Sequence, residues 1–409
     1  MTARDQTGPD VGDVVEVTPD RIGYGGDAVA RVDGLVVFIP FAAPGDRLRV
    51  RLIERRKHLA RATIEEIISP SKLRRDPPCE YFGECGGCQL QHLNYDSQLE
   101  AKIGFVRDSL ERIGHIRWTG PIEIEPSREL GYRSRARVQI DRRTGSVGFK
   151  RARSNSVCDI TQCPVLSPEL NDLLHQIRAM DLSASSRGLL SGEIEAAAGD
   201  QGVSASARLT GLPTGDLEIE VEGLWFSFSP KVFFQSNSTM LSPLVREVVG
   251  REGGSVAIDL YAGVGLFTIP MARSFDSVVA VEADDRTAAY ARRNVARNGV
   301  TNVRVMCTTV QGASRQLGEL GAGLIVLDPP RRGAAEAIPM LAAMRPERIV
   351  YVSCDPVTLS RDLRSLVEHG FELVGVKAFD LFPQTYHVET VARLVAGPRV
   401  GSGVVNSSD

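Results

Sequence analysis

The sequence predicts an α/β fold in which a C-terminal, doubly wound, Rossmann-like sheet follows a small β-barrel and a central α+β region. From about residue 230, strand-like and helix-like segments alternate, which is typical of a mainly parallel sheet covered by helices. Before Pro70, about five short strands alternate with Gly, Pro and Asp turns, the pattern of a small closed barrel of the oligonucleotide-binding kind. A length of 409 residues favours two or three domains, which we place at residues 1–70, 71–230 and 231–409.

The composition excludes several classes of protein. Apolar residues make up 43% of the chain and charged residues 24%, which indicates a globular protein rather than a disordered or collagen-like one. The chain has no apolar run long enough for a transmembrane helix, and its first residues lack the apolar stretch of a secretory signal. We therefore expect a cytoplasmic protein without a membrane partner, in which seven cysteines do not form a disulfide framework.

Charge is distributed unevenly along a chain whose net charge is only −3. Residues 45–75 hold ten Lys/Arg and four Asp/Glu, and residues 128–153 hold nine and two. Residues 193–222 have the opposite sign, with seven acids and one Arg. Two basic segments on a nearly neutral chain favour a local anion-binding face, and two solvated strand faces are the alternative.

The first two regions are assigned from periodicity and turn signals. Residues 96–114 have the spacing of an amphipathic helix, with an apolar face made of Leu99, Ile103, Val106, Leu110 and Ile113. Strands are predicted from alternation and β-branched residues. The barrel strands are expected at residues 14–18, within 24–34, and at 35–41, 48–56 and 60–68, and the central strands at 134–140, 147–149, 204–209, 217–221 and 224–228.

A glycine-rich turn opens the C-terminal region. The run from Asp259 to Gly265 (DLYAGVG) follows an apolar strand, and its glycines let the backbone turn tightly against a nucleoside-bearing ligand. Glu282 ends the next strand, where a carboxylate can accept hydrogen bonds from ribose hydroxyls. Because Thr268 replaces the third glycine of the dinucleotide fingerprint, the turn alone leaves NAD and S-adenosylmethionine equally open.

Two later strands also end in polar residues. Asp328 precedes two prolines and a pair of arginines (DPPRRG), and the prolines hold its carboxylate at the sheet edge where ligands of such folds bind. Cys354 ends the following strand, so its thiol is expected at the same edge. Glu389 opens the last strand near the same crevice and is a candidate general base. The arginines are either phosphate contacts or an ordinary helix start.

Cysteines also crowd into the segment that follows the barrel. Cys79, Cys85 and Cys88 lie within ten residues, and a fourth thiol is available downstream at Cys163 or, as the weaker candidate, Cys158. Four thiolates suit either zinc or an iron–sulfur cluster, and their spacing does not decide between the two.

Taken together, these motifs resemble the RNA 5-methyluridine methyltransferase family over nearly the whole chain. Residues 12–70 resemble its RNA-binding TRAM domain. The resemblance implies methylation of uridine C5, an S-adenosylmethionine cofactor, and a 4Fe-4S cluster on Cys79, Cys85, Cys88 and Cys163. The motifs that carry it are CEYFGECGGCQLQH, PKVFFQSN, DLYAGVGLFT, LDPPRRG, SCDP and TYHVETVARL.

The resemblance also implies a role for each site residue. Cys354 is the expected nucleophile and Glu389 the expected base. Four residues are expected to bind the cofactor: Gln235, Tyr261, Glu282 and Asp328. A thiolate that adds to C6 of uracil makes C5 nucleophilic, and a base must then remove the C5 proton. No adenine contact is carried over to the segment MCTTVQG, which lacks the family's usual polar residue.

The RNA substrate is less sharply indicated. The barrel and the cysteine segment resemble the branch that acts on 23S rRNA, while the same chemistry on tRNA is the alternative. Two further hypotheses are an NAD-dependent oxidoreductase and an RNA-binding protein without catalytic activity. The chain is expected to be a monomer.

Overall fold

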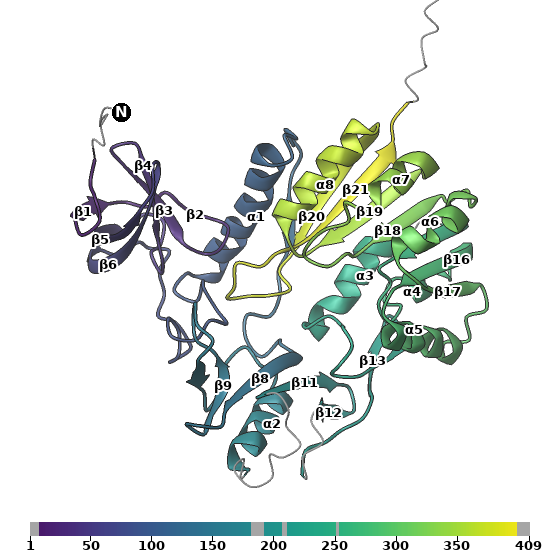
Figure 1. Cartoon of the computed structure of the whole chain (residues 1–409), viewed down its shortest axis with the longest axis horizontal. Helices are drawn as coiled ribbons and strands as arrows, with labels where there is room; N and C mark the ends of the chain where they lie inside the picture. The colour runs from purple at the N-terminus through teal and green to yellow at the C-terminus, as the bar shows by residue number, and fades with distance from the viewer. Residues whose placement is uncertain (1–7, 181–191, 207–210, 251–252, 399–409) are drawn as a thin grey trace, which may run out of the picture.

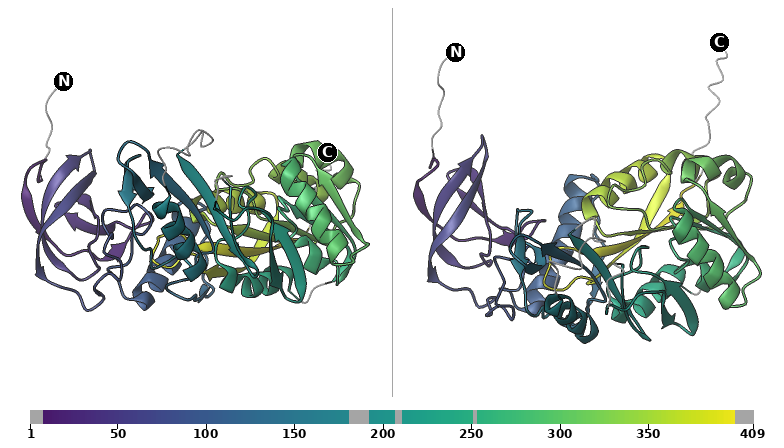
Figure 2. Two further views of the ribbon diagram at one scale, coloured as in Figure 1. Left: turned by 90° about the horizontal axis from the view of Figure 1, so that it is seen from below. Right: turned by 60° about the horizontal axis from the view of Figure 1, so that its bottom comes forward.

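The computed structural model describes residues 8–180, 192–206, 211–250 and 253–398. In this part of the chain, sheets of six, five and eight strands and one two-stranded sheet follow one another. The N-terminal sheet lies at one end of the molecule and the eight-stranded sheet at the other, with the five-stranded sheet between and below them (Figure 1). Two further views show the same separation (Figure 2).

The N-terminal sheet has the order β1-β5-β6-β4-β3-β2, in which only the β4–β6 pair is parallel. Its strands alternate as predicted: Leu48, Val50 and Leu52 are buried, while the arginines between them are exposed. The structure adds a sixth, two-residue strand to the five that were expected. The strands are β1 (Val14–Val17), β2 (Arg21–Ile22), β3 (Ala28–Val32), β4 (Leu35–Ile39), β5 (Arg47–Arg55) and β6 (Leu59–Ser69).

The central region contains a five-stranded sheet, β10-β9-β8-β11-β12, and the separate hairpin β13–β14. Sequence reasoning missed β10, β11 and α2. Strand β11 is rich in Ala and Glu, which are poor strand formers, whereas α2 carries a start signal, with Ser167 as N-cap before Pro168. Residues 207–209 of one predicted strand lie outside the described residues. The elements are β8 (Arg135–Asp141), β9 (Ser146–Lys150), β10 (Val157–Asp159), α2 (Pro168–Ala179), β11 (Glu193–Gly199), β12 (Gly202–Ala205), β13 (Leu217–Val221) and β14 (Leu224–Phe228).

The eight-stranded sheet has the order β17-β16-β15-β18-β19-β21-β20-β7. Its first five strands are parallel, and β21 lies antiparallel between β19 and β20, so the predicted antiparallel pair is confirmed. Strand β7 (Glu123–Glu125), which the sequence did not indicate, adds a parallel edge. The other strands are β15 (Gly254–Leu260), β16 (Phe275–Glu282), β17 (Val303–Cys307), β18 (Leu324–Leu327), β19 (Arg348–Ser353), β20 (Phe371–Phe379) and β21 (Glu389–Ala396).

Helices cover this sheet, and no helix of the described residues is long and apolar enough to cross a membrane. The longer helices begin at side-chain caps, such as Asp284 for α5 and Asp355 for α8. The helices are α3 (Leu241–Val249, after the 3₁₀ turn Ser238–Met240), α4 (Thr268–Met271), α5 (Asp285–Arg297), α6 (Val310–Gly318), α7 (Ile338–Met344) and α8 (Pro356–Glu368).

Helix α1 (Tyr95–Arg112) forms where a helix was predicted, but its buried face differs from the expected one. Ile113 is exposed, whereas Gln98 and Lys102 are completely buried. The physical reason is hydrogen bonding, because both polar side chains bind the loop between β20 and β21. The periodicity of apolar residues could not predict this face, because polar side chains are buried there through their hydrogen bonds.

Candidate active site

The carboxyl edge of the large sheet collects the predicted catalytic and cofactor residues. Tyr261, Asp328 and Cys354 directly follow the parallel strands β15, β18 and β19. Glu389 joins them from β21, because an antiparallel strand begins at the edge where its parallel neighbours end. Thr390 pairs with Ser353, which places Glu389 beside Cys354 in the crevice.

The turn after β15 is shaped by left-handed backbone. Gly263 and Gly265 have φ values of 57° and 95°, and Tyr261, although not glycine, has 62°. Glu282 holds this turn, because its Oε2 accepts a hydrogen bond from the Gly263 amide at 3.0 Å. A side chain at Gly263 would meet no atom within 4 Å, so the turn faces open space. The Tyr261 hydroxyl donates to Glu336 Oε1 at 3.2 Å.

The residue that replaces the third glycine, Thr268, has a structural explanation. Its hydroxyl donates to Asp259 Oδ2 at 2.5 Å, and both residues are fully buried. Burial raises the pKa of Asp259 to about 7, and this hydrogen bond partly opposes the shift. Thr268 therefore binds one oxygen of a buried carboxyl group at the position where a dinucleotide-binding turn has glycine.

Gln235 reaches the same crevice from the turn before α3. It is 5% exposed, and its Nε2 donates to Asp328 Oδ2 at 3.4 Å. Burial raises the pKa of Asp328 to about 7, and the hydrogen bond from Gln235 lowers it. The structure thus brings two of the four predicted cofactor residues into direct contact.

Cys354 lies among groups that oppose its ionisation. Burial and the neighbouring Glu389 raise its pKa to about 12, while the positive charge of Arg331 opposes the shift. Arg331 also contacts His387, with 3.2 Å between Nη2 and Nε2. The next arginine, Arg332, pairs with Glu336 at 3.3 Å. Of the two predicted arginines, Arg331 therefore interacts with residues of the crevice, whereas Arg332 pairs with a residue just before α7 begins.

Glu389 is only 2% exposed. Burial raises its pKa well above the usual range, and the negative charge of Asp328 raises it further. Two carboxyl groups and one thiol therefore share a desolvated crevice, and the positive charge of Arg331 acts on both Cys354 and Glu389. Such a cluster of shifted pKa values is typical of sites that move protons.

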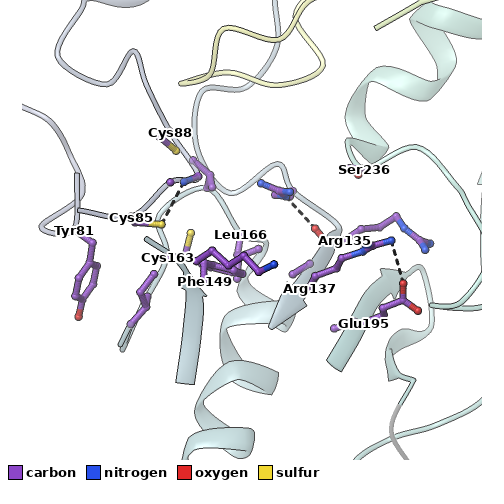
Figure 3. Close-up of a pocket in the computed structure, with 18 of the residues that line it drawn as sticks. Tyr81, Cys85, Cys88, Arg135, Arg137, Phe149, Cys163, Leu166, Glu195 and Ser236 are labelled. Atoms are coloured by element: carbon purple, nitrogen blue, oxygen red, sulfur yellow. Dashed lines mark hydrogen bonds and ion pairs between the residues drawn. The ribbon is translucent and has the colours of Figure 1, made fainter. Parts of the chain in front are cut away.

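The cysteine segment forms a second site. Cys79, Cys85, Cys88 and Cys163 line one pocket of about 580 Å³ (Figure 3). Cys158 does not line it, since its buried thiol donates to Glu84 Oε1 at 3.5 Å. Burial raises the pKa of Cys85 to about 11 and of Cys88 to about 12.

The four thiols surround the pocket without meeting at one point. Within the described ranges, no three His, Cys, Asp or Glu side chains are close enough to hold a single metal ion. Gln91, which sequence reasoning missed, is buried, lines the same pocket and lowers the pKa values of Cys79 and Cys88 against the effect of burial. Its position three residues after Cys88 could have indicated that it lies at the cysteine site.

Basic and aromatic side chains complete the pocket. Arg135, from β8, donates to the carbonyl oxygens of Pro230 and Val232 at 2.8 and 2.7 Å, and burial lowers its pKa to about 10. It therefore holds the turn that leads to Gln235. On this turn, Phe233 is 66% exposed, a large apolar side chain at the pocket wall that the sequence analysis did not single out. The other cations lining the pocket are Arg133, Arg137, Lys150, Arg151, Arg153 and Lys231.

Known proteins match both halves of this architecture. The family model "tRNA (Uracil-5-)-methyltransferase" matches residues 214–396, and the TRAM domain model matches residues 10–64. The 23S rRNA (uracil(1939)-C(5))-methyltransferase RlmD of Aeromonas hydrophila is 33% identical over 92% of this chain and 95% of its own. The chain belongs to the RNA uracil-C5 methyltransferase family. This membership confirms the predicted family and excludes the NAD-dependent oxidoreductase hypothesis.

Two further relatives show how far the family likeness extends. An RNA methyltransferase of Aquifex aeolicus, described as uncharacterized, is 32% identical over 93% of this chain and 98% of its own. The crystal structure of Pyrococcus abyssi tRNA (uracil-54, C5)-methyltransferase in complex with S-adenosyl-L-homocysteine aligns with a TM-score of 0.72 at 26% identity. It covers 93% of this chain and all of that one, so the predicted α/β architecture is confirmed.

Proposed function

We propose that this protein transfers a methyl group from S-adenosylmethionine to C5 of a uridine in RNA. One observation carries the proposal: Cys354, Glu389 and Asp328 come from three different strands and meet at one sheet edge. The relatives named as 23S rRNA methyltransferases support ribosomal RNA as the substrate. If the substrate is ribosomal RNA, we expect the protein to act in the cytoplasm. We also expect it to be a monomer.

The turn after β15 fits a nucleoside cofactor. Gly263 faces open space, and the Glu282 carboxylate at the end of β16 is held beside it. Tyr261, Gln235 and Asp328 border the same crevice, and together with Glu282 they would hold S-adenosylmethionine. When bound, this cofactor supplies an electrophilic methyl group. The Gly263 amide is occupied by the Glu282 carboxylate rather than free to bind a phosphate, which favours this cofactor over a dinucleotide.

The chain's own residues account for the remaining chemistry. Cys354 first loses its thiol proton to solvent, and the positive charge of Arg331 stabilises the thiolate. Its sulfur then forms a bond to uracil C6 and makes C5 nucleophilic. After C5 is methylated, Glu389 accepts the C5 proton, the C6–S bond breaks and the thiolate leaves. The desolvated crevice keeps Glu389 basic enough for this step. A base inside a helix cannot reach Cys354, so the uridine must be unstacked or flipped.

We further propose that Cys79, Cys85, Cys88 and Cys163 hold a 4Fe-4S cluster. Four thiols spaced around a roomy pocket suit a group larger than one ion, and the polar Gln91 side chain, which lowers the pKa values of Cys79 and Cys88, suits thiolate ligands. Protein purified without oxygen is expected to be brown and to contain iron and sulfide in equal amounts. A colourless protein with stoichiometric zinc would contradict the assignment.

The deciding experiment follows tritium from methyl-labelled S-adenosylmethionine into RNA from a strain that lacks this gene. Label is expected in 5-methyluridine of the 23S fraction, with the 16S and tRNA fractions as internal controls. The Cys354→Ala variant should transfer no label while it still binds S-adenosylhomocysteine. Label in a different nucleoside, or transfer by the variant, would overturn the covalent mechanism.

Transfer RNA is the second candidate substrate. The relative of known structure is named as a tRNA methyltransferase and resembles this chain over its full length. The domain architecture therefore does not by itself separate the two RNA classes. Label confined to the tRNA fraction would establish this alternative, and a chain that binds RNA tightly without any transfer would establish the non-catalytic hypothesis.

A further inference from the structure

The loop between β20 and β21, residues 380–388, is held at one residue, Gln384. Gln384 is fully buried and has a φ of 71°, a left-handed conformation that side chains other than glycine rarely adopt. Such a conformation persists when surrounding contacts determine it. Glu389, the proposed base, follows this loop directly.

The cysteine segment supplies the backbone contacts of Gln384. Its carbonyl oxygen accepts hydrogen bonds from the amides of Gln89 and Leu90 at 3.0 and 2.9 Å. These are the two residues that follow Cys88 in the chain. In Figure 3 the yellow C-terminal loop passes close to Cys88, in agreement with these distances.

The side chain of Gln384 uses both ends of its amide. Its Oε1 accepts from Arg75 Nη2 and from Gln98 Nε2, each at 3.0 Å. Its Nε2 donates to Glu129 Oε2 at 3.3 Å. In return, Gln98 Oε1 accepts from the Gln384 amide at 2.9 Å. Every polar atom of this buried residue therefore has a partner from the segment between the barrel and β8.

Other contacts of the loop link the position of Gln384 to the crevice. The buried Lys102 pairs with Asp380 and donates to the Phe382 carbonyl oxygen at 3.0 Å, and Tyr132 donates to that of Pro383 at 2.9 Å. Three residues after Gln384, His387 contacts Arg331, the cation that serves Cys354. A shift of Gln384 would thus displace both Glu389 and the partner of Arg331.

We propose that Gln384 is a positioning residue through which the cysteine segment sets the placement of the catalytic base, Glu389. The proposal rests on the proposed function, because it assigns a role within that reaction. It gives the cysteine pocket a role in the chemistry without requiring its ligands to touch uridine. It also explains why polar side chains of α1 occupy its buried face.

The chemistry indicates which step depends on this positioning. Formation of the C6–S bond requires Cys354, whereas its cleavage requires Glu389 to accept the C5 proton first. When Glu389 is displaced, methyl transfer to C5 proceeds, but the C5–H and C6–S bonds persist. The protein then remains covalently attached to methylated RNA, a species that a denaturing gel detects by its tritium.

The test is the variant Gln384→Ala, which removes the amide but keeps a non-glycine residue at this backbone conformation. We expect kcat to fall roughly tenfold to a hundredfold, as for a catalytic group displaced by about 1 Å, with KM for RNA unchanged. Labelled protein–RNA adduct should accumulate on the gel. Gln201→Ala, at an exposed glutamine in the β11–β12 turn, is the matched control and should behave as wild type.

Three outcomes would overturn the proposal: wild-type turnover by Gln384→Ala, a rise in KM alone, or lost turnover without adduct in a variant that melts as wild type. If this variant does not fold, Gln98→Met removes two of the same hydrogen bonds, and the absence of adduct there would also overturn it. Iron content measured in parallel separates loss of the cluster from loss of positioning. Failure of wild-type protein to label any uridine would instead reject the proposed function.

Discussion

Two basic segments, residues 45–75 and 128–153, carry similar net charge in the sequence but meet different surroundings in the fold. In the first segment, all of which is described, eight of ten cations lie within 4.0 Å of a carboxylate. In the second, Arg133, Arg135 and Lys150 line the cysteine pocket, and no described carboxylate lies within 4.0 Å of them. These three cations without a described carboxylate partner favour the central region over the barrel as the place of the predicted anion-binding face.

Strand register explains the difference. On β5, the exposed Arg49 pairs directly with Glu16 of β1 and with Glu66 of β6. Opposite charges placed across neighbouring strands neutralise each other and contribute little to stability. On β8 and its flanks, the cations point toward a concave surface, where low-dielectric walls focus their field. A count of charges along a chain cannot distinguish these cases, because the partners come from other strands.

We expect the largest loss of activity from a substitution of Arg331, the cation that acts on Cys354. Arg331→Gln removes the positive charge that favours the Cys354 thiolate, and we expect kcat/KM to fall by about a hundredfold. Arg332→Gln is the matched control, because Arg332 pairs with Glu336 instead, and should lose less than about twofold. Equal losses of kcat/KM in both variants would show that positive charge anywhere near the crevice, rather than the specific position of Arg331 beside the thiol, determines the rate.

The pKa values of the crevice residues predict how the rate of the reaction depends on pH. Cys354, with a pKa of about 12, must lose its proton, and Asp328, with a pKa of about 7, ionises in the neutral range. Both groups become active as protons leave, so kcat/KM should rise with pH from about pH 6 to about pH 9. A rate that falls with pH over this range would contradict a neutral thiol in the free protein.

The sequence indicated the crevice well, because its residues sit at strand ends that apolar runs and proline or glycine turns mark clearly. Cys354 and Glu389 were found in this way, and the structure places both at the expected edge. Gln384 and Gln91 were not found. The role of Gln384 depends on hydrogen bonds between residues as far as 309 positions apart, and local periodicity carries no information about such contacts.

The cysteine pocket shows an intermediate case. Spacing indicated a thiolate site but left two candidates for the fourth ligand, and only the fold shows that Cys163 lines the pocket while Cys158 faces Glu84. Similarly, the spacing of α1 predicted a helix but not its polar buried face. In both examples the missing information was the identity of a neighbour from another element.

A smaller effect is expected for cations at the pocket. Arg133→Met should raise the Kd for RNA by about tenfold at low salt and reduce the salt dependence of binding by about one counterion. The measurement is a filter-binding series at increasing salt, with Lys57→Met, a barrel cation for which no ion pair is found among the described residues, as the matched control. If Lys57→Met weakens binding more than Arg133→Met, the anion-binding face lies on the barrel after all.

The smallest effect is expected on the paired barrel face. Arg49→Gln removes a cation that lies between Glu16 and Glu66, both exposed, so the free energy of unfolding should fall by less than about 1 kcal/mol. Affinity for RNA should change by less than about twofold, because the charge that is lost was already neutralised. Denaturant unfolding and the same filter-binding series measure both quantities. A tenfold loss of affinity would mean that RNA displaces the two glutamates, and the contrast between the two basic segments would then describe only the free protein.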